Sequence, residues 1–313
     1  MHDIKEWAAA GNNSFFVRAG IFLIGVLAVL GVLAPFIAPF SPDVPSGPSL
    51  SPPDARHWLG TNALGQDIFS QLVFSCRTSL AVGVTVGLGA TLLGFLAGAV
   101  AGYYPRVWGL VLMRLVDILM TIPRLPLIIL LAVFLGPSLR NVILVLIFLS
   151  WPGIARTVRS YVLALSQREY LRFVRFAGGG FFYVLRRHLT AELLPLLVAK
   201  AVGTASQAIA AEAGLSFLGL GDPTIRSWGM MIRSAWEYPG LLWTPAWWWW
   251  LLPPALMVSL AILGFTLTGY AWEASFTSHR KEAGYEYGER YEDREPYFES
   301  GKWRDLPGLE RNS

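Results

Sequence analysis

Long stretches of the chain carry no charged side chain. The longest of these stretches are 19–40, 78–105 and 238–272. A helix needs about 20 residues to cross the roughly 30 Å of hydrocarbon in a bilayer. Each stretch is long enough to do so, and the pattern therefore predicts an integral membrane protein whose spans are helices.

Three further apolar segments are interrupted by a few polar residues. With them the chain has six candidate spans, at about 18–40, 78–104, 110–136, 139–156, 193–213 and 250–272. The expected fold is an all-α bundle of about six transmembrane helices. In the second span small residues recur at intervals of four, as in Gly94, Gly98 and Gly102. This spacing lets helix backbones approach closely in lipid, and packing within the chain is a sufficient explanation for it.

The most polar internal segment, 156–192, is rich in arginine. Its arginines are Arg156, Arg159, Arg168, Arg172, Arg175, Arg186 and Arg187. An excess of basic residues marks the cytoplasmic loops of membrane proteins, so this segment is expected in the cytoplasm. Counting spans from there predicts that both termini are cytoplasmic and that 41–77 and 214–249 are external.

Composition narrows the classes of function. Charged residues make up 15% of the chain, against about 25% in typical soluble domains. The net charge of +4 comes from basic residues that cluster beside the spans, so we expect lipid and no nucleic acid as a partner. The single cysteine, Cys76, excludes a disulfide within the chain.

No catalytic or metal-binding pattern is visible in the sequence. The four histidines are far apart, and none has the spacing of a zinc site. The phosphate-binding motif G-x-x-x-x-G-K-[ST] is missing, so if ATP drives this protein another polypeptide binds it. We expect no catalytic residue, metal or bound cofactor in this chain, which leaves transport, signalling or scaffolding.

The 156–192 segment has the pattern of a helix, a break at Gly178, Gly179 and Gly180, and a second helix. A basic element of this kind between two spans can lie on anionic lipid. It can also dock in a cleft on a partner protein. The residues alone do not choose between these two interpretations.

Four stretches together resemble one known family. They are HWLGTNALGQDIFSQLVFSCRTSLAVG (57–83), MRLVDILMTIPRLPLIILL (113–131), EYLRFVRFAGGGFFYVLRRHL (169–189) and EAGLSFLGLGDPTIRSWGMMI (212–232). Each is similar to a segment of the inner-membrane permease subunits of binding-protein-dependent ABC importers, in the dipeptide, oligopeptide and nickel branch. The resemblance implies a type I ABC importer permease bundle in the cell (inner) membrane.

The likeness covers about 57–272 and suggests a division of the chain. Residues 1–56 form an N-terminal cytoplasmic segment, the first span and an external loop. Residues 57–272 form the permease core, with five spans and the cytoplasmic coupling loop 156–192. Residues 273–313 form a cytoplasmic tail that is either disordered or docked.

The resemblance implies that 169–189 forms a coupling helix in a groove of the ATPase. The candidate coupling residues are Glu169, Tyr170, Arg172, Phe173, Val174, Arg175, Gly178 and His188. Gly178 and His188 match the family pattern. Residues 172–174 stand where Glu-Ala-Ala is usual, and Ala191 replaces the usual Pro. These departures indicate either an adapted ATPase partner or weaker coupling.

The resemblance also implies partners and a mechanism. A homologous second permease, two ATPase subunits that bind ATP and Mg, and an external solute-binding protein would complete the importer. The expected function is ATP-driven import of peptides or related small solutes by alternating access. In such a system the binding protein selects the solute, so dipeptides, oligopeptides, nickel chelates and glycans stay open.

Two ionisable residues in the third span are candidates for the pathway or for polar contacts between helices. Asp117 is expected to pair with Arg114 near the cytoplasmic boundary, and Arg124 lies deeper. Glu212 is expected at the external end of the fifth span, within reach of water. An ion-coupled secondary transporter is the alternative, although the spans show no cluster of carboxylates for it. A non-transporting membrane scaffold is a third interpretation.

Overall fold

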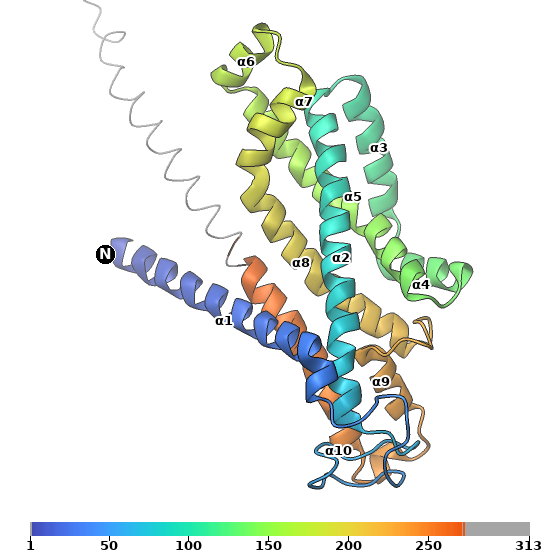
Figure 1. The fold of residues 1–313 in the computed structure, drawn as a ribbon. Coiled ribbons are helices and arrows are strands. Elements are labelled where there is room, and N and C mark those ends of the chain that lie inside the picture. Colours follow the sequence, from blue (N-terminus) through green and yellow to red (C-terminus); the bar gives the residue numbers. More distant parts are fainter. Residues whose placement is uncertain (1, 271, 273–313) are drawn as a thin grey trace, which may run out of the picture. The chain divides into compact units, whose positions relative to one another are not determined.

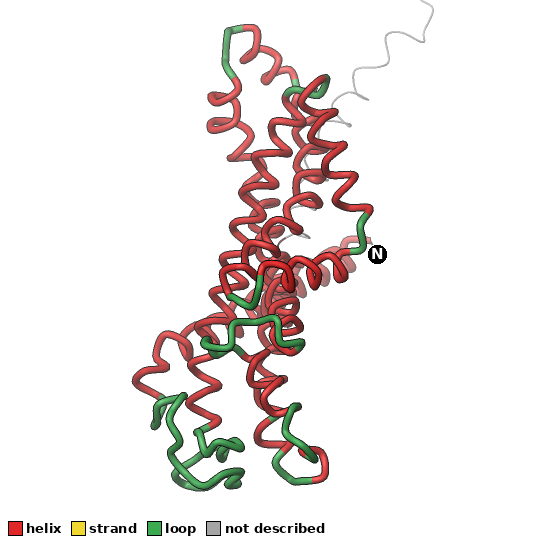
Figure 2. Tube along the Cα trace, turned by 90° about the vertical axis from the view of Figure 1, so that its right-hand side faces the viewer, coloured by secondary structure: helices red, strands yellow, loops and turns green. Residues whose placement is uncertain are grey.

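The computed structural model describes residues 2–270 and 272 of the chain (Figure 1). The tail expected at 273–313 therefore lies outside the described residues. The described part is helical, and its single β-bridge, Thr61 with Asp67, belongs to no strand (Figure 2). An all-α membrane bundle is confirmed.

Five helices within the described residues are long and apolar enough to cross a membrane. They cover Phe15–Ile37, Ile68–Tyr103, Leu139–Ser166, Phe181–Phe217 and Trp247–Tyr270. A sixth crossing results if the bent pair Val107–Thr121 and Arg124–Leu135 is one span. The prediction of about six spans is thus confirmed.

The elements follow one another along the chain, with a long loop at 38–67 and a last helical segment at 252–270. They are α1 (His2–Ile37), α2 (Ile68–Tyr103), α3 (Val107–Thr121), α4 (Arg124–Leu135), α5 (Leu139–Ser166), α6 (Glu169–Phe176), α7 (Phe181–Val184), the π-helix η1 (Leu185–Leu189), α8 (Thr190–Phe217), α9 (Trp228–Trp236), the 3₁₀-helix η2 (Leu241–Trp243) and α10 (Trp247–Trp250).

Helix α2 is the centre of the bundle and packs along α5 and α8. Its glycines make this possible. A Cβ atom at Gly98 would lie 2.6 Å from the Ala155 carbonyl oxygen of α5, and one at Gly87 would lie 2.5 Å from the Ala201 carbonyl oxygen of α8. Neither position has room for a larger residue. The small-residue spacing therefore serves packing within the chain, as the sequence indicates.

The third predicted span, 110–136, consists of two helices and not of one. The chain bends by 91° between α3 and α4. Proline lacks an N–H and disfavours helical backbone in the residue before it. Ile122 is accordingly extended, with ψ 131°, and Pro123 precedes the first residue of α4.

Two opposite ends of the bundle carry the connections between spans. Helices α6 and α7 lie at one end, together with the turn between α2 and α3 (Figure 1). There the ring centroids of Tyr103, the last residue of α2, and Phe181 are 5.1 Å apart. Helices α9 and α10 lie at the other end beside the 41–67 loop. In that loop Asp67 accepts from the Ser70 N–H at 2.8 Å, which caps α2, and contacts buried His57 at 2.9 Å.

Candidate functional site

Helix α6 begins at Glu169 and ends in a glycine cap. Gly178 has φ 85°, in the left-handed region that side chains disfavour, and the Gly179 N–H donates to the Val174 carbonyl oxygen at 2.9 Å. This bond, with glycine at the preceding position, is typical of a Schellman motif. The glycine break therefore ends the helix sharply and turns the chain back toward α7.

Contacts with α8 and the bundle hold α6 in place. Leu171 is buried, with 1% of its surface exposed. The Tyr170 hydroxyl donates to the Glu192 carboxylate of α8. Partial burial, and then this carboxylate, raise the pKa of Tyr170 above its usual value. One face of α6 is thus fixed, and the opposite face is left open.

The open face carries large aromatic side chains. Phe173 is 76% exposed and Phe176 is 91% exposed, and Phe182 of α7 is also exposed. Glu169 is exposed in the first turn of α6, and Val174 is half-buried. The side chains of Arg172 and Arg175 lie outside the described residues. The exposed rings form an aromatic surface that no described residue covers.

A short π-helix, η1, joins this element to the long helix α8. Single π turns inside helices often occur at functional sites, because they interrupt the regular bonding ladder. His188 lies in η1, with its ring 5.8 Å from those of Tyr170 and Tyr183. Its buried Nε2 has no partner among the described residues. The candidate residues of 169–189 therefore share one end of the bundle.

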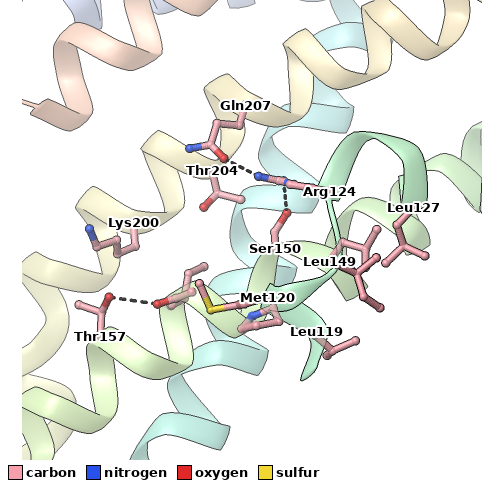
Figure 3. Close-up of a pocket in the computed structure, with 14 residues that line it drawn as sticks. Leu119, Met120, Arg124, Leu127, Leu149, Ser150, Thr157, Lys200, Thr204 and Gln207 are labelled. Carbon is pink, nitrogen blue, oxygen red and sulfur yellow. Dashed lines mark hydrogen bonds between the residues drawn. The ribbon is translucent and has the colours of Figure 1, made fainter. Parts of the chain in front are cut away.

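A second candidate site is a cavity of about 320 Å³ between α3, α4, α5 and α8 (Figure 3). Its lining residues are Leu119, Met120, Ile122, Arg124, Leu127, Leu149, Ser150, Pro152, Gly153, Ile154, Thr157, Lys200, Thr204 and Gln207. Residues on both sides of the bend between α3 and α4 line this space, Leu119 and Met120 before it and Arg124 and Leu127 after it.

Arg124 reaches across the cavity to two other helices. Its Nη1 donates to Gln207 Oε1 of α8 at 2.8 Å, and its Nη2 donates to Ser150 Oγ of α5 at 2.8 Å (Figure 3). Sequence reasoning identified Arg124 but missed Gln207 and Ser150. The available signal was the spacing of Lys200, Thr204 and Gln207, which places three polar residues on one face of an otherwise apolar helix.

Asp117 has a different partner from the one expected. Its Oδ1 accepts from Arg156 Nη2 of α5 at 2.5 Å, so the expected pair with Arg114 is wrong. Both side chains of the observed pair are half exposed. Helix α3 packs against α5, and this contact gives Asp117 a partner that is 39 positions away in the sequence.

The expected exposure of Glu212 to water is also wrong. Glu212 is 1% exposed, and its Oε1 accepts from Ser216 Oγ at 2.7 Å. Helix α9 covers this part of α8, where Gly229 approaches Ala213 so closely that a Cβ atom would lie 2.7 Å from its Cα. The sequence suggested an external loop at 214–249 and gave no sign that part of it folds back over α8.

Comparison with known proteins identifies the bundle. Residues 91–278 match the family model described as "Binding-protein-dependent transport system inner membrane component". This match covers well over half of the chain. The chain belongs to this family.

The chain is similar in sequence to curated relatives over most of their length. The dipeptide transport system permease protein DppC of Bacillus subtilis is 36% identical, over 84% of this chain and 81% of that protein. The nickel transport system permease protein NikC of Escherichia coli is 35% identical, over 86% of this chain and 96% of that protein. The di/tripeptide transport system permease protein DppC of Pseudomonas aeruginosa is 31% identical, over 85% of this chain and 89% of that protein.

These findings establish the class of the protein. It is a multi-pass inner-membrane permease subunit of a binding-protein-dependent ABC importer in the dipeptide, oligopeptide and nickel branch. It is a transport subunit and not an enzyme, and ATP hydrolysis lies on partner subunits. Membership of this family implies ATPase and solute-binding partners. Nothing in the comparisons favours a secondary transporter or a scaffold.

Proposed function

We propose that the chain imports peptides by alternating access, paired with a homologous second permease and driven by two ATPase subunits that bind ATP and Mg. An external binding protein delivers the solute. The single observation that carries the coupling role is the aromatic surface of α6, with Phe173 and Phe176 exposed. An aromatic surface that its own chain leaves uncovered suits a protein partner.

The same proposal assigns an orientation. The α6 end faces the cytoplasm with both termini, and the α9 end faces outward. Two features support this assignment: the arginines of 168–187 belong to the α6 end, and the turn between α2 and α3, which contains Arg106, lies there too (Figure 1). Basic residues collect on the cytoplasmic side of membrane proteins. We also keep the division into 1–56, a permease core of 57–272 and a cytoplasmic tail of 273–313.

Peptides are the solute class that we favour. Two of the relatives described above are dipeptide or di/tripeptide permeases, and one is a nickel permease. The three relatives have similar sequence identity to this chain, so identity alone does not distinguish a peptide permease from a nickel permease. The polar cavity beside Arg124 favours the peptide class, because it offers hydrogen-bonding side chains from α4, α5 and α8.

The proposal makes α6 the part that transmits movement. When the ATPases close on ATP, the groove that holds α6 shifts. The Tyr170 contact and the η1 turn pass that shift to α8. Since α8 lines the cavity, its displacement opens the path toward one side of the membrane and closes it toward the other.

The test uses the importer purified from its own cell and reconstituted in vesicles. Phe173→Asp puts a charge at the centre of the aromatic surface, and we expect at least a tenfold loss of bound ATPase and of ATP-driven dipeptide uptake. Val107→Asp is the matched control, because Val107 is 70% exposed at the start of α3 and lies outside α6. Full ATPase binding and uptake by the Phe173 variant would refute the docking role. Uptake without any ATPase would refute the importer mechanism.

A further inference from the structure

Three tryptophan side chains project from the chain where it enters its last membrane-crossing helix, Trp247–Tyr270. Trp243 of η2 is 93% exposed, and Trp247 and Trp248 of α10 are 43% and 45% exposed. We call these three residues the tryptophan face. The face belongs to the end of the bundle that carries α9, α10 and the 41–67 loop (Figure 1). The described part of the chain therefore leaves large aromatic rings open at this end.

The opposite side of the same segment is fixed to the core. Its buried residues are Leu241, Ala246, Trp249 and Trp250, which pack in one cluster with residues of α2 and α9. The Thr244 hydroxyl donates to the Leu241 carbonyl oxygen at 2.9 Å and closes the turn after η2. The Trp248 ring packs edge-on against buried Trp249, with centroids 5.4 Å apart. The packing thus holds the tryptophan face in one orientation, pointing away from the core.

The tryptophan face continues into an exposed apolar stripe of the last helix. The stripe consists of Trp248, Leu252, Leu256, Leu260 and Leu263. Its members are three or four positions apart, so they lie on one face of the helix. Ser259 is exposed beside the stripe and donates its hydroxyl to the Ala255 carbonyl oxygen at 2.9 Å, so its polar group is satisfied within the helix. A stripe of this kind suits contact with hydrocarbon.

Charge and packing place this stripe away from the polar cavity. Residues 238–272 contain no charged side chain. The cavity and its Arg124 lie between α3, α4, α5 and α8. The last helix packs closely on α1, where a Cβ atom at Gly20 would lie 2.7 Å from the Gly264 carbonyl oxygen. Lipid is therefore the occupant that fits the stripe, because lipid tails need no polar contact from it.

The tryptophan face lies where the stripe reaches the membrane surface. Tryptophan collects at the boundary between hydrocarbon and water, because its ring is apolar and its N–H needs a hydrogen-bond partner. Leu256 is eight residues beyond Trp248, which corresponds to about 12 Å along a helix. Half of the roughly 30 Å of hydrocarbon is about 15 Å. With Trp248 at the boundary, Leu256 comes close to the middle of the bilayer.

We propose that the tryptophan face is a lipid-binding surface that sits among the headgroups at the α9 end and fixes the depth of the last helix. The partner is the phospholipid of that leaflet, bound through ring contacts and through hydrogen bonds from indole N–H groups to headgroup oxygens. The proposal depends neither on the solute nor on the direction of transport, because it concerns one end of the bundle and not a side of the membrane.

The test measures the depth of single labelled positions in the importer complex, reconstituted in phosphatidylcholine vesicles. Trp243→Cys and Trp248→Cys are each labelled with NBD iodoacetamide. Cys76, the one native cysteine of the chain, is buried, and the wild-type complex treated in the same way gives the background from other subunits. We expect a nitroxide on the lipid headgroup to quench both labels about twofold more strongly than a nitroxide deep in the acyl chain or aqueous iodide.

Two control positions calibrate the measurement. Ala55→Cys lies in the 41–67 loop at the same end, exposed between Asp54 and Arg56, and iodide should quench its label most strongly. Leu256→Cys lies in the middle of the stripe, and the deep nitroxide should quench its label most strongly.

Three results would overturn the proposal. Quenching of the Trp243 and Trp248 labels mainly by iodide would show that the face points into water. Protection of both labels from every quencher would show that another subunit of the complex covers the face. Iodide quenching that disappears on addition of the solute-binding protein would assign the face to that protein.

The depth of the last helix provides a second test. Trp243→Ala, Trp247→Ala and Trp248→Ala are combined in the Leu256→Cys chain, and the ratio of headgroup to deep quenching at the Leu256 position should change about twofold. The same three positions replaced by Tyr should leave the ratio unchanged, because Tyr shares the preference for the membrane boundary. An unchanged ratio in the alanine variant would show that the tryptophan face does not fix the helix.

Discussion

Two surfaces of the bundle are open in the single chain, and they present different groups. The polar surface carries Asp117, Arg124, Arg156, Lys200 and Gln207, on α3, α4, α5 and α8. The apolar surface is the outer side of α1, where Phe22, Val29, Val32 and Phe36 are exposed.

Lipid can cover the second surface without cost, because it has no polar group to leave unsatisfied. Charges at membrane depth on the first surface require water, an anion or protein. Exposure in one chain therefore has two meanings. On α1 an exposed apolar side chain can contact lipid, whereas beside Arg124 an exposed polar side chain needs water, an anion or protein.

The largest expected effect is a difference in membrane insertion between two variants that each introduce an arginine, one on each surface. Val29→Arg places a charge in the middle of α1, where insertion costs about 2.5–3.5 kcal/mol. Thr121→Arg makes a change of similar size at the end of α3, four residues after Asp117. We expect the Val29 variant to be lost from washed membranes, as measured by immunoblot, and the Thr121 variant to remain. Equal loss of the two variants would contradict the distinction between the surfaces.

The second-largest expected effect is a loss of stability when the packing of α2 is disturbed. Helix α2 contacts α1 as well as the helices of the polar surface. Gly98→Ala forces a methyl group against α5, and overpacking of this kind typically costs about 1–3 kcal/mol. Gly25→Ala in α1 is the matched control, because a Cβ atom there meets nothing within 4 Å. Thermal unfolding in detergent should show a clear loss for the first and none for the second. A comparable loss for Gly25→Ala would contradict the packing described.

A smaller effect is expected from the ion pair on the polar surface. Asp117→Asn and Arg156→Gln each remove one side of a half-exposed pair, and such pairs contribute about 0.2–1 kcal/mol. The double variant should lose less stability than the sum of the single variants, as a double-mutant cycle would measure. Strict additivity would show that the two side chains do not interact in the membrane.

The smallest effect lies at the α6 end, away from both surfaces. The folded-state pKa of Tyr170 is raised above the unfolded value of about 10. Its contribution to stability is therefore fully present below about pH 10 and is lost as the pH rises through the folded pKa. Wild type should lose stability relative to Tyr170→Phe above about pH 10, as thermal unfolding between pH 8 and 11 would show. A pH-independent difference would contradict the burial of the Tyr170 hydroxyl and its contact with Glu192.

Much of the fold could be read from local pattern. The uncharged runs determined where helices cross the membrane, because the cost of burying charge in hydrocarbon depends on the residues of each run alone. The glycines of α2 likewise indicated close packing before any partner helix was known. The short helix α6 and the break after it also followed from local pattern, because Gly178, Gly179 and Gly180 interrupt a helical segment.

Tertiary structure decided which residues meet. Asp117 contacts Arg156, Glu212 is sealed by α9, and Arg124 meets Gln207. Each contact joins positions that are far apart in the sequence, and each depends on how helices pack or bend. Hydrophobic periodicity describes one helix at a time and contains no information on its neighbours. The sequence alone therefore determined the number and nature of the spans, and the packing of α3, α4, α5 and α8 decided where their polar groups converge.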